Sequence, residues 1–190
     1  MTCGVSPMAS DSDSKEISLR DRGIYFMSKD FDEDSAKDVV TWILESNFRK
    51  DPEYKHLTLI INSNGGDTGA AFSMIDILRG SKIPVHTLGL GTIASCGLLL
   101  FMAGKHRILT PNTSILSHQY AWGSAGKHHE LLATTKEMDN TSKRIIEHYR
   151  KCTKLPIKVI KEELLPASDV WLTAEEAKAY NLVDEIRTTV

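Results

Sequence analysis

The sequence has few cysteines, almost no net charge and no long hydrophobic run, and each of these absences excludes a class of protein. Three cysteines among 190 residues, without CxxC or Cys/His metal spacing, are typical of free thiols in a reducing compartment. A net charge of -2 gives no reason to expect nucleic acid or an anionic membrane surface as a partner. The longest apolar run, 98–103, is too short to cross a bilayer, and the first residues show no secretory signal. We therefore expect a cytoplasmic protein that binds neither membranes nor nucleic acids.

Motifs for metals and organic cofactors are also missing. The sequence contains no HxxxH or HxH pattern and no carboxylate cluster, which are common sources of metal ligands. It contains neither a phosphate-binding P-loop nor a dinucleotide fingerprint. We therefore expect chemistry that needs no metal and no cofactor.

The length and composition indicate one globular domain preceded by a short arm. A chain of 190 residues with 41% hydrophobic and 25% charged residues is large enough to bury a core and is of ordinary globular composition. Residues 1–14 are rich in serine and aspartate and contain little that can be buried. We assign residues 1–18 to a mobile N-terminal arm or removable leader, and residues 19–190 to a single domain.

Predicted strands and helices alternate along this domain. Short apolar runs predict strands at 24–27, 57–61, 85–90, 108–109, 115–116 and 182–184. Helical spacing predicts helices around 36–44, 70–78, 98–103, 127–152 and 156–164, and a final helix from a capping box at Thr173 and Glu176 to about residue 181. The density of apolar residues at 57–61 favours a strand covered on both faces. This alternation predicts an α/β fold with stacked ββα-like units.

Two candidate groups lie where predicted strands end. Ser95 stands between small residues before an apolar helix, where its hydroxyl is presented beside free backbone N–H groups. The same position is typical of a serine that only caps a helix. Gly65 and Gly66 form a turn that leaves room for backbone N–H groups to bind an oxyanion, but for the two glycines taken alone a plain turn is the better explanation.

A histidine and an aspartate complete the set of candidates. His118 follows the predicted strand at 115–116, where its ring can be fixed at an active-site edge. The alternative is a core histidine whose ring is simply hydrogen-bonded. Asp169 lies four residues before the Thr173 cap, where an ordinary loop aspartate is the alternative. Nucleophile, base, orienting acid and oxyanion donors are together the parts of a serine hydrolase.

In order along the chain, these segments resemble the ClpP family, the proteolytic subunits of ATP-dependent Clp proteases. The segments that carry the resemblance are IINSNGG (60–66), GTIASCG (91–97), AG (103–104), LTPN (109–112), SHQ (117–119), DVWLTAEEA (169–177) and YNLVD (180–184). The resemblance covers about residues 19–186. It implies the ClpP/crotonase fold, with the long helix as a protruding handle.

The resemblance also implies a function and residue roles. Ser95 would be the nucleophile, His118 the general base and acid, and Asp169 the residue that orients the ring. The N–H groups of Gly66 and Cys96 would form the oxyanion hole. The function implied is that of a serine endopeptidase in heptameric rings, possibly stacked as a tetradecamer, that receives unfolded proteins from a Clp/Hsp100 unfoldase.

The chain departs from the family pattern at four places. Asn64 stands where the family usually has proline, and Asp67 where it more often has a small or apolar residue. A carboxylate at Asp67 can disfavour acidic substrates or raise the pKa of His118. Ser168 stands where the family commonly has an arginine that pairs across rings, and the segment before Leu19 lacks the usual apolar strand and axial loop.

Two other classes of function stay open. The first is a structural or regulatory ring subunit that assembles with a partner protease, favoured by Asn64, Asp67 and Ser168. The second is a crotonase-like acyl-CoA enzyme, which shares the fold and the oxyanion hole but needs no Ser/His/Asp set.

Overall fold

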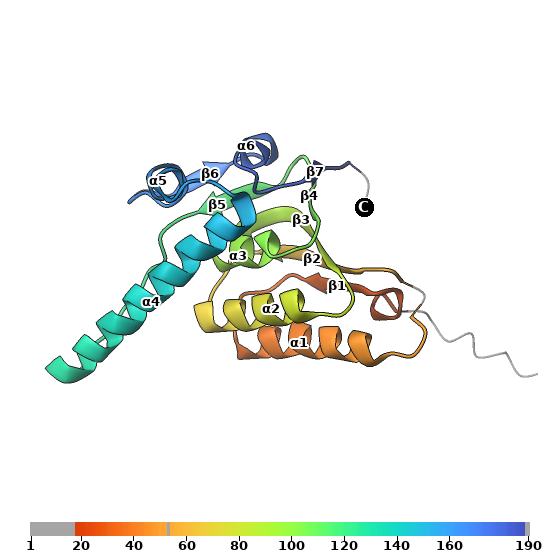
Figure 1. The fold of residues 1–190 in the computed structure, drawn as a ribbon, viewed down its shortest axis with the longest axis horizontal. Helices are drawn as coiled ribbons and strands as arrows, with labels where there is room; N and C mark the ends of the chain where they lie inside the picture. The colour runs from red at the N-terminus through yellow and green to blue at the C-terminus, as the bar shows by residue number, and fades with distance from the viewer. Residues whose placement is uncertain (1–17, 53, 189–190) are drawn as a thin grey trace, which may run out of the picture.

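The fold is a mainly parallel sheet with helices packed against it, which confirms the α/β prediction. The computed structural model describes residues 18–52 and 54–188. Within these residues, seven strands form one sheet in the order β1-β2-β3-β4-β7, and β5 and β6 extend it from β3 (Figure 1). All pairs are parallel except β5 with β6. The strands are β1 (Ile24–Met27), β2 (Leu57–Ser63), β3 (Val85–Ala94), β4 (Arg107–Leu109), β5 (Ser114–Ser117), β6 (Val170–Leu172) and β7 (Glu185–Ile186).

The helices divide into a layer on the sheet and one long projecting helix. Figure 1 shows α1 and α2 side by side below the sheet, and α4 running out of the body. The helices are α1 (Glu33–Phe48), α2 (Thr68–Gly80), α3 (Cys96–Met102), α4 (His128–Thr153), α5 (Ile157–Val159) and α6 (Ala174–Ala179), with a 3-10 turn η1 (Arg20–Arg22) and a π-helical turn η2 (Ile160–Leu164). The predicted capping box is confirmed, because Thr173 Oγ1 accepts from Glu176 N–H and the Glu176 carboxylate accepts from Thr173 N–H.

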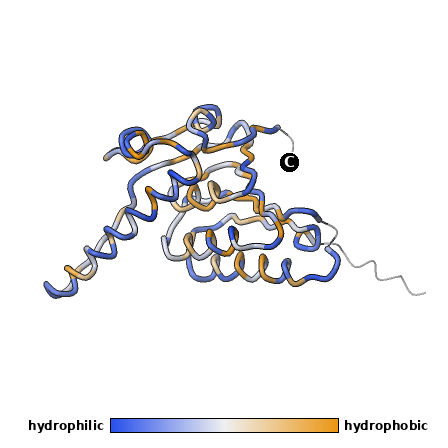
Figure 2. The backbone as a smooth tube through the Cα atoms, viewed as in Figure 1, coloured by the Kyte–Doolittle hydropathy of each residue, from blue (hydrophilic) through white to orange (hydrophobic). Residues whose placement is uncertain are grey.

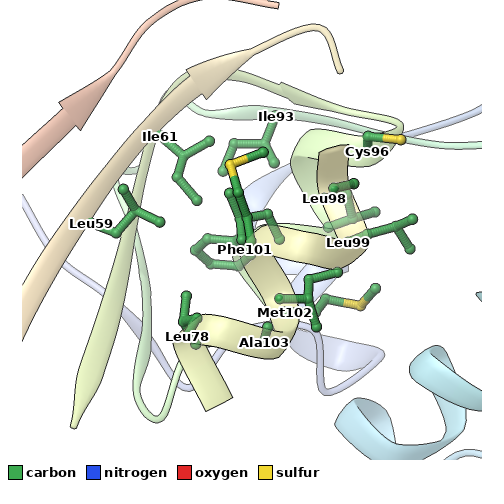
Figure 3. Close-up of a cluster of buried hydrophobic side chains, with 14 of the residues drawn as sticks. Leu59, Ile61, Leu78, Ile93, Cys96, Leu98, Leu99, Phe101, Met102 and Ala103 are labelled. Carbon is green, nitrogen blue, oxygen red and sulfur yellow. The ribbon is translucent and has the colours of Figure 1, made fainter. Parts of the chain in front are cut away.

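The core lies between one face of the sheet and helices α1, α2 and α3. Leu57, Leu59 and Ile61 of β2 are fully buried, and Figure 3 shows Phe101 of α3 packed among the buried side chains of this cluster. Thr58 and Ile60, which point to the other face, are only half-buried. The prediction that this strand is covered on both faces is therefore wrong for a single chain, because the helices cover one face only.

Three predicted boundaries differ from the structure for identifiable reasons. The strand predicted at 85–90 continues to Ala94, because Gly91 with φ 67° forms a bulge after which the strand pairs with β5 instead of β4. The strand predicted at 182–184 is wrong, because Leu182 and Val183 are buried in a turn and pairing with β4 involves Glu185 and Ile186. The helix predicted at 156–164 is split into α5 and η2.

The proposed domain boundaries stay a prediction. Residues 1–17, most of the proposed arm, lie outside the described residues, as do residues 53, 189 and 190. Among the described residues, the projecting α4 is the counterpart of the handle that the resemblance implies (Figure 1). No helix in the described ranges has a long enough apolar stretch to span a membrane.

Candidate active site

The ends of three neighbouring strands bring the predicted triad residues together. β3 pairs with β5 up to Ala94 and Leu116, so Ser95 comes next to the end of β5. β5 pairs antiparallel with β6 through Ser117 and Val170, so the next residues on each strand, His118 and Asp169, lie opposite each other. The sheet register therefore places serine, histidine and aspartate at one edge, although they are far apart in the sequence.

Ser95 occupies a strained turn between β3 and α3. Its backbone has φ 55° and ψ -122°, a conformation that a residue with a Cβ adopts at a cost of about 1–3 kcal/mol. Its N–H donates to the Leu116 carbonyl at 3.0 Å, which fixes the turn against β5. The side chain makes no cap hydrogen bond to α3, so the helix-cap alternative is not the role it has here. A strained strand-to-helix turn that exposes a serine hydroxyl is the geometry of a nucleophile elbow.

The diglycine turn lies directly against this elbow. A Cβ on Gly65, whose φ is 98°, would stand 2.8 Å from Ser95 Cβ, and one on Gly66, whose φ is 143°, would stand 2.5 Å from the Phe31 carbonyl oxygen. Only glycine therefore fits at these two positions without movement of the backbone.

Two backbone N–H groups beside Ser95 are left without an acceptor by the surrounding pairing. Phe31 donates to the Gly65 carbonyl and accepts from Asp67 N–H, each at 2.8 Å, so this bridge does not use the Gly66 N–H. The Cys96 N–H opens α3, where an N–H has no intrahelical acceptor. The Cys96 thiol donates to the Gly66 carbonyl at 3.2 Å and so ties the two segments together.

His118 is held by its two neighbours. Ser117 Oγ donates to the Leu164 carbonyl at 2.5 Å and therefore accepts from the Tyr149 hydroxyl at 2.7 Å. Gln119 donates its side-chain amide to the Leu165 carbonyl at 2.9 Å. Of these three partners, Tyr149 lies on α4, Leu164 ends η2 and Leu165 follows it, so the packing of these helices fixes the segment that carries the imidazole.

The three candidate groups are close but not fully connected. His118 Nδ1 lies 3.9 Å from Asp169 Oδ1, beyond hydrogen-bond distance, and the Asp169 side chain is 64% exposed. Ser95 and His118 line one small cavity, but no hydrogen bond joins these two described residues. Catalytic hydrogen bonds are often long in the absence of substrate and shorten when it binds.

Cys96, beside Ser95, does not compete as a nucleophile. Burial raises the pKa of its thiol to about 11, so the group stays neutral near pH 7. A neutral thiol reacts far more slowly than a thiolate.

In the described part of the chain, no set of three or more His, Cys, Asp or Glu side chains is arranged to hold a metal ion.

Comparison with known proteins gives the family. The sequence model of a family described as Clp protease matches residues 9–190. The chain belongs to the Clp protease family. Similar curated members include ATP-dependent Clp protease proteolytic subunit 1 of Chlamydia pneumoniae, 35% identical over 178 residues, and that of Chlamydia caviae, 33% identical over 167 residues. These alignments cover 90% and 85% of this chain and 89% and 84% of the relatives.

A third member of the family is ATP-dependent Clp protease proteolytic subunit 3 of Rhizobium meliloti (strain 1021). It is 33% identical over 136 residues, which cover 70% of this chain and 69% of the relative. The resemblance found in the motifs is thus confirmed at the level of the family. The roles of individual residues stay predictions.

The departures from the Clp protease pattern have local structural explanations in part. Asp67 is the N-cap of α2, and its carboxylate accepts from Ala70 N–H at 2.7 Å. This hydrogen bond gives Asp67 a structural role besides those predicted for it. Asn64 and Ser168 are exposed, and nothing in a single chain explains either substitution.

One strand at this site was not predicted from the sequence. The segment Val170–Leu172 is strand β6, whereas no strand was predicted between Asp169 and the Thr173 cap. Its pairing with β5 is what brings Asp169 opposite His118. Val170 and Trp171, two neighbouring residues of high β-propensity, are a weak signal that could have indicated this strand.

Proposed function

We propose that this chain is the serine endopeptidase subunit of a ring-shaped Clp protease, with Ser95 as nucleophile, His118 as base and Asp169 as orienting acid. The observation that carries the proposal is the strained turn at Ser95, which lies beside the end of β5 that leads into His118. Its support is the placement of all three groups at one sheet edge and the membership of the Clp protease family.

The proposed mechanism follows acyl transfer. Neutral His118 takes the Ser95 proton as the hydroxyl oxygen attacks a peptide carbonyl, and then gives this proton to the leaving amine. Asp169 stabilises the imidazolium between these steps. The N–H groups of Gly66 and Cys96 bind the developing oxyanion, where one such donor is worth about 3–4 kcal/mol of barrier. Water then hydrolyses the acyl-enzyme and restores Ser95. The reaction needs no metal and no cofactor.

We also propose self-association into rings, heptameric and possibly stacked, and delivery of unfolded substrates by a Clp/Hsp100 unfoldase. The relatives are named as subunits of ATP-dependent proteases. A parallel sheet is normally covered on both faces, whereas β1 and β2 leave Phe26 and Ile60 partly open in one chain. This open face and the projecting half of α4 are the surfaces that we assign to contacts between subunits.

Active-site labelling tests the catalytic role. We expect a fluorophosphonate probe to label the assembled wild type, and Ser95→Ala to abolish labelling and lower peptide cleavage by at least about 10⁴-fold. Ser114→Ala, which changes an exposed serine at the start of β5, is the matched control and should label like wild type. A folded and assembled wild type that takes up no probe would overturn the proposal.

A second candidate function is a structural or regulatory subunit that needs a partner protease. The separation of 3.9 Å between His118 and Asp169, and the exposure of the latter, favour it. Native mass measurement of complexes purified from the source cell decides between the two. A homo-oligomer with full peptidase activity excludes the second candidate, and an inactive chain found only in mixed rings supports it.

A further inference from the structure

The cavity beside Ser95 is small and mostly apolar. Ser95 and His118 line it, together with residues that include Leu99, Ile145, Tyr149 and Tyr120. Its volume of about 10 Å³ is room for about one water molecule. If Ser95 attacks a peptide carbonyl, the side chain on the acyl part of the substrate (P1) lies next to this serine. The cavity is therefore the place where a P1 side chain is accepted or refused.

A much larger cavity lies behind the same wall. Its volume is about 480 Å³, and its lining includes Met138, Ile146 and Leu165. Tyr120 and Ile145 line both cavities, so these two side chains form the partition between them. The small size of the cavity at Ser95 is thus set by this partition and not by a lack of space in the fold.

Of the two residues that line both cavities, Tyr120 is the less buried. Ile145 is 6% exposed on α4, and Tyr149 is buried with its hydroxyl bonded to Ser117. Tyr120 lies in the connection between β5 and α4 and is half-buried. Its ring packs against the core, and its hydroxyl donates to the Met138 carbonyl on α4 at 2.7 Å.

We infer that Tyr120 determines the P1 specificity of this peptidase and restricts it to small side chains such as alanine. The inference rests on the proposed function. An alanine side chain adds one methyl group, which the cavity accommodates, whereas leucine or phenylalanine requires the Tyr120 ring to leave its place. Because this cost falls on the acylation transition state and on the bound substrate, it appears as a ratio of kcat/KM values between substrates.

The test compares three fluorogenic peptide amides that differ only at P1, with alanine, leucine or phenylalanine. Wild type should rank alanine first. Tyr120→Ala joins the two cavities and should raise kcat/KM for phenylalanine relative to alanine by about tenfold or more. Tyr120→Leu, a second variant that keeps an apolar side chain in this segment, should shift the ratio in the same direction.

Two controls separate specificity from structural damage. Tyr120→Phe removes the hydrogen bond to Met138 but keeps the ring, and should keep the wild-type order. Trp122→Ala removes an exposed neighbour whose ring centroid lies 6.4 Å from that of Tyr120 but which is not part of the cavity wall, and should leave the ratios unchanged. If Tyr120 had a merely structural role, its substitution would lower kcat/KM for all three substrates in proportion.

The possible failures are distinguishable. Suppose that wild type and Tyr120→Ala both take up the fluorophosphonate probe, at the same rate, and give the same ratios of kcat/KM between the three peptides. The inference is then wrong and the proposed function stands. A wild type that prefers phenylalanine also overturns the inference. If wild type takes up no probe and cleaves none of the peptides, the proposed function fails and the inference fails with it.

Discussion

At the scale of single residues, the candidate site depends on backbone conformations that few residue types allow. Ser95 has a positive φ although it carries a Cβ, and the neighbouring glycines occupy positions where a Cβ would collide with backbone atoms. Strain of this kind persists only where the surroundings fix it, here the hydrogen bond from Ser95 N–H to β5 and the bridge at Phe31. Substitutions that alter the backbone should therefore affect activity strongly.

The first prediction concerns Gly66. Gly66→Ala places a Cβ against the Phe31 carbonyl and should displace the N–H that we assign to the oxyanion hole, lowering kcat by about 10²-fold or more. Gly80→Ala is the matched control, because Gly80 ends α2 with no atom within 4 Å of an added Cβ. That control should leave kcat unchanged and raise stability by about 0.4–1 kcal/mol. Peptide hydrolysis and thermal unfolding of both variants measure the difference; a Gly66→Ala enzyme of normal kcat would contradict the prediction.

The second prediction concerns Asp169. Asp169→Asn removes the charge that we assign to stabilising the His118 imidazolium, and should lower kcat by about 10²–10⁴-fold with little change in KM. Stability should hardly change, because this carboxylate is exposed. Steady-state kinetics measures kcat and KM, and thermal unfolding measures the stability. Unchanged kcat would show that the distance of 3.9 Å persists during catalysis and that another group orients the imidazole.

At the scale of elements, the sequence predicted the fold class well and the site geometry only in part. Apolar runs predicted β1, β4 and β5, because a short apolar run bounded by turn residues is consistent with a buried strand. The candidate residues Ser95, His118 and Asp169 were named from order and surroundings. Their proximity was implied only by the family resemblance. Local patterns could not predict it, because it depends on long-range pairing of β5 with a three-residue strand that periodicity does not detect.

Burial on α4 was a second property that the sequence did not reveal. His148 has polar neighbours in the chain, yet it is 3% exposed. Its Nε2 donates to the Leu99 carbonyl at 2.8 Å, and Nδ1 has no hydrogen-bond partner among the described residues. Tertiary contact between α4 and α3, which no local pattern encodes, makes this difference.

The third prediction follows from this burial. Burial, with a smaller effect of Arg79, lowers the pKa of His148 from 6.5 to about 4. Above pH 6.5 the ring is neutral in both states, but between pH 6.5 and about 4 only the unfolded chain gains the proton. The free energy of unfolding should therefore fall by about 1.4 kcal/mol for each pH unit over this range because of His148 alone.

Urea unfolding at pH 7 and pH 5 measures this effect. His148→Gln, whose amide can still donate to Leu99, should be less stable than wild type at pH 7 but lose less stability on going to pH 5. His128→Gln, at the exposed start of α4, should keep the wild-type pH dependence. The prediction is wrong if His148→Gln and wild type lose the same free energy between the two pH values.

At the scale of the whole molecule, a single chain leaves two surfaces that a stable globule would cover. One is the sheet face that carries Phe26, which is 49% exposed. The other is the free half of α4, where all the buried residues of the helix lie at or beyond Thr141. Figure 2 shows an apolar segment near the outer end of this helix, where Leu131 and Leu132 are exposed. A half-helix of this length is marginally stable in water alone, so contact with another subunit should stabilise it.

The last prediction tests whether this apolar segment holds subunits together. Leu132→Glu places a charge on the 59% exposed leucine and should shift the native mass distribution towards smaller species, because a carboxylate in a subunit contact must be desolvated. The thermal stability of each folded subunit should change little, since the substitution touches no core contact. Thr135→Glu adds the same charge at an exposed polar position of the same half and is the matched control. If Leu132→Glu and Thr135→Glu give the wild-type mass distribution, the leucine segment is not part of the assembly interface. If both reduce the mass alike, charge alone weakens the contact and the apolar segment has no specific part in it.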